Sequence, residues 1–358
     1  MAMSSGTDRS TELAAAVCAA AEARTPLCIR GGSSKDFYGR TPVGDALDIV
    51  GHRGIVNYEP TELVLTARAG TRLRAIEAEL HKAGQMMPFE PPHFGGRATL
   101  GGAVASGLSG PARPWGGSVR DFVLGIRLVN GRGEHLRFGG QVMKNVAGYD
   151  IARLATGSLG MLGVITEVSL KVLPRPATTA TRTLELPAAE GFARVEDAFR
   201  AGIPVTGAMH DGERLYVRLG GTKSAVEAGL ERLGGDRLGD ATAYWMALRD
   251  HKLPFFLGDG PPLWRISLPP LAQPPKLPGP RILDWNGQLV WQRTDADAAS
   301  VFAAAAERGG HATRFRGGDR GGDAFQPLPR ANRRLHENIK AAFDPGQTFN
   351  PGRMYEGL

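Results

Sequence analysis

Cysteine is nearly absent from this sequence of 358 residues, in which Cys18 and Cys28 are the only two. Two thiols are too few for an iron–sulfur cluster, and their spacing is not the CxxC pattern of a zinc site. They also provide no disulfide framework, which fits a reducing compartment such as the cytoplasm. We therefore expect both cysteines to serve as small core residues.

Long hydrophobic runs are missing as well. No uninterrupted stretch of about 18 apolar residues occurs, so no direct membrane span is expected. Residues 1–10 are polar, and the alanine-rich stretch that follows carries Glu12, Glu22 and Arg24, unlike the apolar region of a secretion signal. The sequence predicts a cytoplasmic protein, and leaves open a peripheral attachment to the cytoplasmic membrane through partner subunits.

The most recognisable nucleotide-binding signatures are missing too. There is no GxxxxGK[ST] loop, and no GxGxxG opens a helix after a strand, which disfavours the doubly wound dinucleotide fold. The net charge is +7, but Lys and Arg are scattered without interleaved aromatics, so no nucleic-acid partner is expected. The basic excess better suits an anionic cofactor, a small carboxylate or an acidic partner.

Glycine and proline are abundant, with 49 and 25 residues. Glycine is required where the chain takes positive φ or where backbone approaches a ligand closely, so this composition favours a protein that cradles a cofactor. A chain of this length is expected to fold as two domains.

Hydrophobic periodicity predicts an α+β protein whose first domain spans residues 1–176. Thr71 is expected to cap a helix that places Leu73, Ile76 and Leu80 on one face. The other elements expected in this domain are a helix over 12–23, strands over 27–30, 46–50, 63–68 and 164–172, a loop-like region over 88–117 and a hairpin over 124–138.

The second domain is expected over 177–325, after a proline linker, as an α+β (ferredoxin-like) cap with two similar halves. Thr222 is the expected cap of a helix that follows a strand over 215–219. The other expected elements are a strand–helix–strand unit over 289–315, a proline-dense ordered loop or edge over 261–280, and a tail over 326–358 that contains a helix and returns to the first domain.

Four glycine-rich segments carry the chemistry. Residues 30–35 follow a strand and expose successive backbone N–H groups and two hydroxyls, as a pyrophosphate requires, although a plain turn is the competing interpretation. Residues 99–107 allow close backbone approach to a phosphate. Residues 116–121 form a loop that presents the Asp121 carboxylate. Residues 157–166 begin with glycines, which leave room for a flat ring system, and continue as a strand.

These segments, in this order and spacing, resemble the PCMH-type FAD-binding domain of the vanillyl-alcohol oxidase family. The resemblance implies FAD as the cofactor. It implies the following cofactor-binding positions: Arg30, Gly31, Gly32, Ser33, Ser34, Pro92, Thr99, Gly101, Gly102, Ser106, Gly107, Asp121, Lys144, Gly160, Gly163, Val164, Ile165 and Asn350. Lys144 near flavin N1 would stabilise the reduced flavin. A solvated loop lysine and, for Asn350, a helix-stop turn are the competing interpretations.

Over essentially the whole chain, the sequence is similar to the FAD-binding subunits of bacterial glycolate oxidases. Seven segments carry this similarity, namely residues 52–58, 90–93, 110–115, 138–150, 263–268, 310–315 and 349–354. The similarity implies oxidation of glycolate, a small hydroxy acid, to glyoxylate. It also implies a complex with a larger FAD-containing catalytic subunit and an iron–sulfur subunit.

Two departures from related proteins matter. Members of the fold that bind FAD covalently have a histidine in the first glycine loop, where this chain has Ser33 and Ser34, so noncovalent FAD is expected. Related D-2-hydroxy-acid dehydrogenases hold a metal with paired histidines in the cap. His210, His251 and His311 are far apart here, so no metal site is predicted, and independent turnover by this chain is in doubt.

Oxidation of a 2-hydroxy acid requires a cation for the carboxylate and a base for the hydroxyl proton. Arg265 and Arg314 are the candidate cations and His311 is the candidate base, with surface ion pairs and a structural histidine as competing interpretations. Two other functions stay open. One is a non-catalytic FAD subunit that relays electrons and docks the catalytic subunit. The other is an NADPH-dependent flavin reductase, for which no nicotinamide fingerprint is present.

Overall fold

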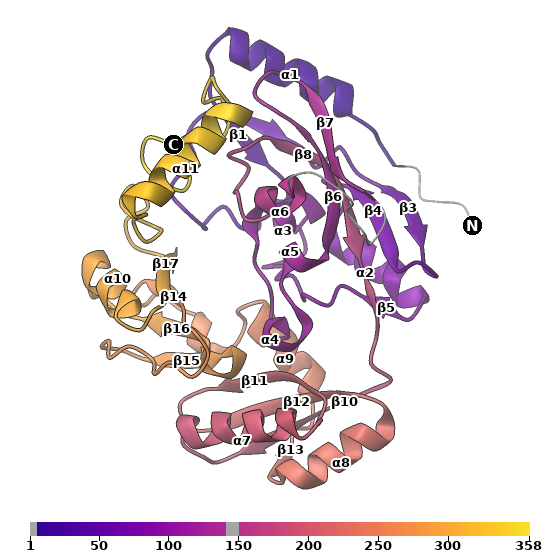
Figure 1. Cartoon of the computed structure of the whole chain (residues 1–358), viewed down its shortest axis with the longest axis vertical. Helices are drawn as coiled ribbons and strands as arrows, with labels where there is room; N and C mark the ends of the chain where they lie inside the picture. Colours follow the sequence, from indigo (N-terminus) through magenta and orange to yellow (C-terminus); the bar gives the residue numbers. More distant parts are fainter. Residues whose placement is uncertain (1–5, 141–149) are drawn as a thin grey trace. The chain divides into compact units, whose positions relative to one another are not determined.

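The computed structural model describes residues 6–140 and 150–358, and the chain divides into two compact units (Figure 1). The first unit comprises Met1–Leu108, Ser118–Pro174 and Pro327–Leu358, and the second comprises Ser109–Gly117 and Arg175–Gln326. The C-terminal segment therefore belongs with the N-terminal part of the chain. Residues 109–117, which the sequence analysis included in the first domain, pack with the second unit instead.

The main sheet of the first unit has five antiparallel strands in the order β3-β4-β8-β6-β7. Their bounds are β3 Ile55–Glu59, β4 Val64–Arg68, β6 Val123–Val129, β7 His135–Gly139 and β8 Val164–Lys171. Two strand pairs accompany this sheet, a parallel pair of β1 (Leu27–Arg30) with β2 (Asp45–Asp48) and an antiparallel pair of β5 (Gln85–Met86) with β9 (Leu173–Pro174).

The helices of the first unit cover one continuous core. They are α1 Ser10–Glu22, α2 Leu73–Lys82, α3 Leu100–Ser106, α5 Val119–Phe122, α6 Ile151–Ala155 and α11 Arg330–Phe343. The expected apolar face of α2 is confirmed, since Leu73, Ile76 and Leu80 are fully buried. Residues three or four apart lie on one side of a helix, so this spacing buries the whole stripe. No helix among the described residues has the length and apolarity needed to cross a bilayer.

The tail is fixed to the first unit by a buried ion pair and by strand-like pairing. Lys340 on α11 donates to the Asp344 carboxylate at 2.7 Å and to the carbonyls of Met161 and Phe349, both at 2.8 Å. Burial lowers the pKa of Lys340, while the charge of Asp344 opposes that shift. The Leu27 N–H donates to the Thr348 carbonyl at 2.7 Å, so the tail runs beside β1.

A buried histidine ties the N-terminal segment to the main sheet. His52 accepts from the Arg9 N–H at Nδ1 and donates to the Thr166 carbonyl from Nε2, both at 2.9 Å. This arrangement requires the neutral ring, because a proton on Nδ1 would remove the acceptor for Arg9. Burial lowers the pKa of His52, and the nearby Asp8 carboxylate opposes that shift only in part.

Acidification should therefore destabilise the protein. A histidine whose pKa is lowered in the folded state takes up its proton more readily in the unfolded state. Its contribution to the free energy of unfolding is therefore fully present above the ordinary pKa of 6.5 and is lost as the pH drops below it. We expect His52→Gln, whose amide can make both hydrogen bonds without titrating, to weaken the dependence of melting temperature on pH. His81→Gln, at an exposed histidine on α2, is the control. If the melting temperature of His52→Gln depends on pH as strongly as that of the unchanged chain, His52 is not the group that makes the protein sensitive to acid.

The second unit is built on one antiparallel sheet in the order β13-β10-β12-β11-β15-β16-β14-β17. Its strands are β10 Thr178–Leu184, β11 Val205–His210, β12 Leu215–Gly221, β13 Asp236–Arg237, β14 Leu263–Ser267, β15 Arg281–Asp284, β16 Leu289–Arg293 and β17 His311–Arg316. Its helices are α4 Arg113–Gly116, α7 Ala188–Arg200, α8 Lys223–Leu233, α9 Ala241–Arg249 and α10 Ala298–Ala306, with short 3-10 turns η1 Pro254–Phe256 and η2 Trp285–Gly287.

The α+β prediction is confirmed in this unit. The first half runs β10-α7-β11-β12-α8-β13, which is the β-α-β-β-α-β order of a ferredoxin-like unit. The expected cap of α8 is present, because Thr222 accepts from the Ala225 N–H at 3.3 Å. The second half contains β16, α10 and β17 as expected. Separate apolar clusters pack beneath the helices of each half.

Three local expectations were wrong. Thr71 does not cap α2, since its hydroxyl is bound to both backbone groups of Gly54. Residues 88–117 are not all loop, because Thr99 caps α3 and because α4 also forms there. The proline-dense stretch 261–280 contains β14, which lies inside the sheet between β16 and β17. In each case tertiary packing outweighed a local signal.

Candidate functional site

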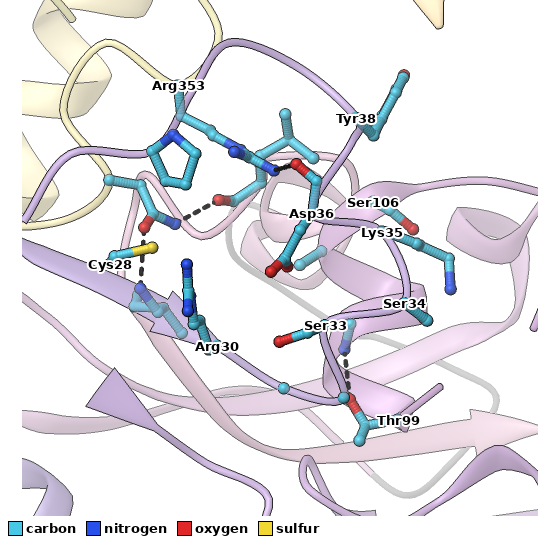
Figure 2. Close-up of a pocket in the computed structure, with 18 residues that line it drawn as sticks. Cys28, Arg30, Ser33, Ser34, Lys35, Asp36, Tyr38, Thr99, Ser106 and Arg353 are labelled. Carbon is cyan, nitrogen blue, oxygen red and sulfur yellow. Dashed lines mark hydrogen bonds between the residues drawn. The ribbon is translucent and has the colours of Figure 1, made fainter. Parts of the chain in front are cut away.

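A pocket lies in the first unit where β1 ends (Figure 2). It is open to solvent, and its cavity volume is about 100 Å³. The structure brings nine of the sequence-predicted positions together on its wall, namely Arg30, Gly31, Gly32, Ser33, Ser34, Thr99, Gly102, Ser106 and Asn350. They come from β1, from the loop that follows it, from the start and end of α3, and from the tail.

The glycine loop lies directly against the segment that leads into α3. A Cβ on Gly31 would be 2.5 Å from the Thr99 hydroxyl, and a Cβ on Gly32 would be 1.5 Å from the Arg97 carbonyl oxygen. A side chain at Gly32 would require the backbone to move, whereas one at Gly31 would require the Thr99 hydroxyl to move. Ser33, the next residue, has φ +55°. Backbone in this left-handed region after a glycine turns successive N–H groups toward one side, as anion-binding loops do.

The groups that face this space fit a diphosphate. Arg30 and Lys35 are cationic, and Ser33, Ser34 and Ser106 supply hydroxyls. Figure 2 shows Arg30, Ser33 and Asp36 directed into the same space. Contact with the Cys28 thiol and the charge of Asp36 raise the pKa of Arg30, so its guanidinium stays charged. Charge-assisted hydrogen bonds from guanidinium and ammonium groups are the strongest that a phosphate oxygen can receive.

The tail completes the pocket through Asn350, which has φ +42°. Its side-chain oxygen accepts from the Ile29 N–H at 2.9 Å, and its amide donates to the Leu159 carbonyl at 2.7 Å. Asn350 therefore links the end of β1 to the 157–162 turn. Gly160 permits this approach, because a Cβ there would be 2.8 Å from the Asn350 amide nitrogen.

Asn350→Ala should destabilise the protein by about 1–3 kcal/mol and weaken FAD binding. The change leaves the Ile29 N–H and the Leu159 carbonyl without the partner that they have at a part-buried position. Chemical denaturation and FAD titration measure the two effects. Asn332→Ala, at an exposed position on α11, is the matched control and should change neither quantity. If Asn350→Ala has the stability and the FAD affinity of the unchanged chain, the hydrogen bonds of Asn350 to Ile29 and Leu159 do not shape the pocket.

Other sequence-predicted positions lie outside the pocket wall. Gly101, Gly107 and Gly163 permit close packing, since an added Cβ would meet Ala69, Gly157 and the Val129 carbonyl, respectively. Val164 and Ile165 are buried in the core of the first unit. Pro92 is buried as well. Lys144 lies outside the described residues.

Asp121 is also away from the pocket wall. Its carboxylate accepts from the backbone N–H and the hydroxyl of Ser118, at 2.8 and 2.7 Å, and so closes a capping box on α5. Burial would raise the pKa of Asp121, but these hydrogen bonds and the charge of Arg153 lower it overall. The carboxylate is thus held as an anion by its own turn.

The pocket also contains residues that sequence reasoning did not select. They are Cys28, Ile29, Lys35, Asp36, Tyr38, Pro42, Ala105, Leu159 and Arg353. Arg353 donates to the carbonyls of Arg40 at 2.7 Å and Asp36 at 3.2 Å, which orients the loop beyond the glycines. Lys35 could have been selected from the sequence, since it is the last residue of the glycine-rich segment 30–35. Arg353 lies in the 349–354 segment that carries the family similarity, but no local pattern indicated that its side chain reaches the glycine loop.

In the second unit, the three catalytic candidates divide between two faces of the sheet. Arg265 pairs with Thr313 across β14 and β17, and Ser267 pairs with His311. Side chains alternate along a strand, so Arg265 and His311 share one face. Arg314, which pairs with Trp264, lies on the opposite face, where its guanidinium is 5.3 Å from the Trp264 ring.

The face with Arg265 and His311 has a second arginine and a tryptophan that the sequence analysis missed. Trp285 is buried and donates to the Gly110 carbonyl at 3.0 Å. The guanidinium of Arg113 is 4.5 Å from its ring, and that of Arg265 is 5.0 Å. Arg265 also donates to the Ser267 hydroxyl at 3.0 Å. Two guanidinium groups are thus oriented on one indole by cation–π contact.

Desolvation, followed by the charges of Arg265 and Arg113, lowers the pKa of His311. Its ring is therefore available as a neutral proton acceptor near pH 7. Asp284, which is buried beside Trp285, brings one negative charge to the same region. The two arginines outnumber it, so the face suits a small carboxylate. Among the described residues, no group of three or more His, Cys, Asp or Glu side chains could hold a metal ion.

Comparisons with known proteins place the glycine loop and α3 in a recognised domain. Residues 8–139 match the family described as "FAD binding domain". The chain is 50% identical to the glycolate oxidase subunit GlcE of Escherichia coli (strain K12) over 335 residues, which cover 94% of each protein. It is 32% identical to the glycolate oxidase subunit GlcD of Bacillus subtilis (strain 168) over 166 residues, which cover 45% of this chain and 34% of that protein.

The fold has a counterpart among solved structures. A structure of alkyldihydroxyacetonephosphate synthase matches with a TM-score of 0.67, at 16% identity, over 95% of this chain and 74% of that one. At this identity the match shows the fold alone. The domain match indicates FAD binding, and the fold match agrees with the α+β architecture.

Proposed function

Because the chain belongs to the family of the Escherichia coli glycolate oxidase subunit GlcE, we propose that it is the FAD-containing redox subunit of a glycolate oxidase that converts glycolate to glyoxylate. The observation that carries this proposal is the pocket at the end of β1, with its glycine loop, two cations and several hydroxyls. Its donor set suits the pyrophosphate of FAD, and the matched domain is an FAD-binding one.

In this proposal, Arg30, Lys35 and the Ser33–Ser34 pair hold the FAD pyrophosphate. Thr99 and Ser106 support the adjoining part of the cofactor, while Asn350 fixes the end of β1. FAD supplies an acceptor for two electrons when it is bound. Binding is noncovalent, because Ser33 and Ser34 stand where covalently flavinylated members of the fold have histidine.

The second unit supplies the groups for a 2-hydroxy acid. Arg265, steadied by Ser267 and Trp285, binds the carboxylate, and Arg113 adds a second positive charge. His311, in its neutral form, accepts the proton of the substrate hydroxyl at its unprotonated ring nitrogen, Nδ1 or Nε2. The pKa of His311 is lowered in the direction that this role requires.

Electrons leave this subunit for an iron–sulfur partner in the proposed complex, which also contains a larger FAD subunit. The two cysteines of this chain cannot hold a cluster, so such a cluster must belong to another polypeptide. A second candidate function is a non-catalytic FAD subunit that relays electrons and docks the catalytic one. The finding that favours it is that the described residues contain no metal-binding group of the kind used by related dehydrogenases.

Assembly of the complex with and without this chain separates the two functions. Glycolate-driven reduction of an artificial dye should be lost when the chain is omitted and should return when purified chain is added. A Gly32→Ala chain should assemble but restore little activity. If the partner subunits oxidise glycolate equally well without this chain, the catalytic proposal fails and the docking function remains.

A further inference from the structure

An arginine that is not part of the pocket wall lies against the glycine loop that follows β1. Arg72 is the residue just before α2. A Cβ on Gly32 would be 2.6 Å from the Arg72 Nη1, so the guanidinium group already contacts the Gly32 backbone. The same nitrogen donates to the Arg97 carbonyl, which packs against Gly32 as well. One guanidinium group therefore joins the glycine loop to the segment that leads into α3.

The backbone around Arg72 is paired with the start of α3. Arg72 forms an antiparallel bridge with Thr99, and the Leu73 N–H donates to the Ala98 carbonyl at 3.0 Å. Thr99 in turn caps α3 by accepting from the Gly102 N–H at 3.3 Å. The starts of α2 and α3 are thus hydrogen-bonded to each other, and the Arg72 side chain extends from this frame to the glycine loop.

The glycine loop has a conformation that its surroundings must hold. Gly31 and Gly32 have no side chains with which to make contacts of their own. Ser33 has φ +55°, a backbone region that costs free energy for a residue with a side chain. Such a conformation persists where neighbouring groups fix it. Here the Thr99 hydroxyl packs against Gly31, and the Arg72 guanidinium packs against Gly32.

The charge of Arg72 adds to this contact. Within the described part of the chain, Arg72, Arg74 and Arg97 make no ion pair, and both glutamates of α2 pair with other side chains, at 3.0 and 2.7 Å. Positive charge that no carboxylate balances favours an anion nearby. The contact and the charge of Arg72 therefore act on the same loop, and both favour an anion that the loop binds.

We propose that Arg72 is a positioning residue for the pyrophosphate of FAD. Arg72 holds the glycine loop against the start of α3, so the loop N–H groups face the anion site before FAD arrives. A loop that is fixed in its bound conformation loses less entropy when the ligand binds. This inference rests on the proposed function only in that the pyrophosphate of FAD occupies the pocket at the end of β1.

Arg72→Met tests this role, because methionine retains part of the apolar stem of arginine but has neither the charge nor the donors. The dissociation constant of FAD should rise about tenfold, mainly through a dissociation rate that is about tenfold higher, since changes within one binding site alter dissociation more than association. Stopped-flow fluorescence of the apoprotein mixed with FAD measures both rates.

Arg74→Met is the matched control. It removes one positive charge from the first turn of the same helix, but the Arg74 guanidinium lies against Gly96 and not against Gly32. FAD should leave Arg74→Met as slowly as it leaves the unchanged chain. Arg72→Lys keeps the charge and a donor for the Arg97 carbonyl, so it should recover part of the lost affinity. Arg72→Lys also provides the comparison, with Arg74→Lys as its control, if Arg72→Met does not fold.

Phosphorus NMR at saturating FAD gives a readout that a purely structural role of Arg72 would not change. The pyrophosphate resonances of bound FAD should shift in Arg72→Met, because the loop donors that face the phosphate oxygens are displaced. The resonances should keep their positions in Arg74→Met. Only occupied protein contributes to this comparison, so a fraction of unfolded chain cannot produce the shift.

Three results would overturn the inference. The first is release of FAD from Arg72→Met at the rate of the unchanged chain. The second is an equal loss of affinity in Arg72→Met and Arg74→Met, since positive charge alone would then account for the effect. The third is a set of phosphorus resonances that is the same in all variants. If the unchanged chain binds no FAD, the FAD pocket itself fails, whereas tight binding by every variant overturns this inference alone.

Discussion

Gly32→Ala should produce a folded protein that binds FAD on the order of a hundredfold more weakly than the unchanged chain. The added methyl group would lie 1.5 Å from the Arg97 carbonyl oxygen, and the contact is with backbone, so a side-chain rotation cannot relieve it. The loop must move away from α3. That movement displaces Ser33, Ser34 and the loop N–H groups from the position in which they face an anion. A hundredfold weaker affinity corresponds to about 2.7 kcal/mol of binding free energy.

FAD titration of the apoprotein, followed by fluorescence, measures this effect. Gly239→Ala is the matched control, because a Cβ at Gly239 meets no atom within 4 Å and the residue has no positive φ. It should bind FAD as the unchanged chain does. Unaltered affinity in Gly32→Ala would mean that the loop after β1 does not hold the pyrophosphate.

The second large effect is expected at Arg265. Arg265→Ala should lower kcat/KM for glycolate by roughly 30-fold to 4,000-fold, since removing one partner of a hydrogen-bonded charge pair that the bound substrate desolvates costs about 2–5 kcal/mol. Arg265→Lys should recover part of the loss, because an ammonium keeps the charge but not the two-point geometry of a guanidinium. Affinity for FAD should not change, because Arg265 does not line the pocket at the end of β1.

Arg314→Ala distinguishes a specific carboxylate site from a general loss of positive charge. Arg314 directly follows Thr313, the cross-strand partner of Arg265, so its side chain lies on the other face, where it contacts Trp264 and the Asp319 carbonyl. We expect kcat/KM within about threefold of the unchanged protein. Equal losses in the Arg265 and Arg314 variants would contradict the assignment of the site to one face. Melting temperatures of both variants exclude unfolding as the cause.

Sequence reasoning located the first glycine loop because its signal is local. A strand over Leu27–Arg30 followed by two glycines was predicted and is confirmed, and so was the Thr222 cap of α8. Each depends on residues a few positions apart, where the preference of the backbone decides the structure. The apolar stripe of α2 was predicted for the same reason.

The remainder of the site depends on pairs that are distant in sequence. Asn350 meets Ile29 across 321 positions, and Arg353 meets Asp36 across 317. No periodicity in a single segment indicates such a contact. Likewise, the face on which Arg314 lies is set by the register of β14 with β17, and one step of register moves every side chain to the other face. Trp285 and Arg113 come together by the same kind of long-range packing.

We expect the isolated chain to bind FAD and to accept electrons from glycolate. An anaerobic absorption spectrum of the purified chain tests it, recorded before and after glycolate is added and again after acid precipitation. We predict a yellow protein whose flavin bleaches with glycolate, stays oxidised with NADPH, and is released as FAD by acid. A yellow protein that glycolate leaves oxidised would contradict turnover by this chain, and a colourless protein that FAD cannot reconstitute would contradict FAD binding itself.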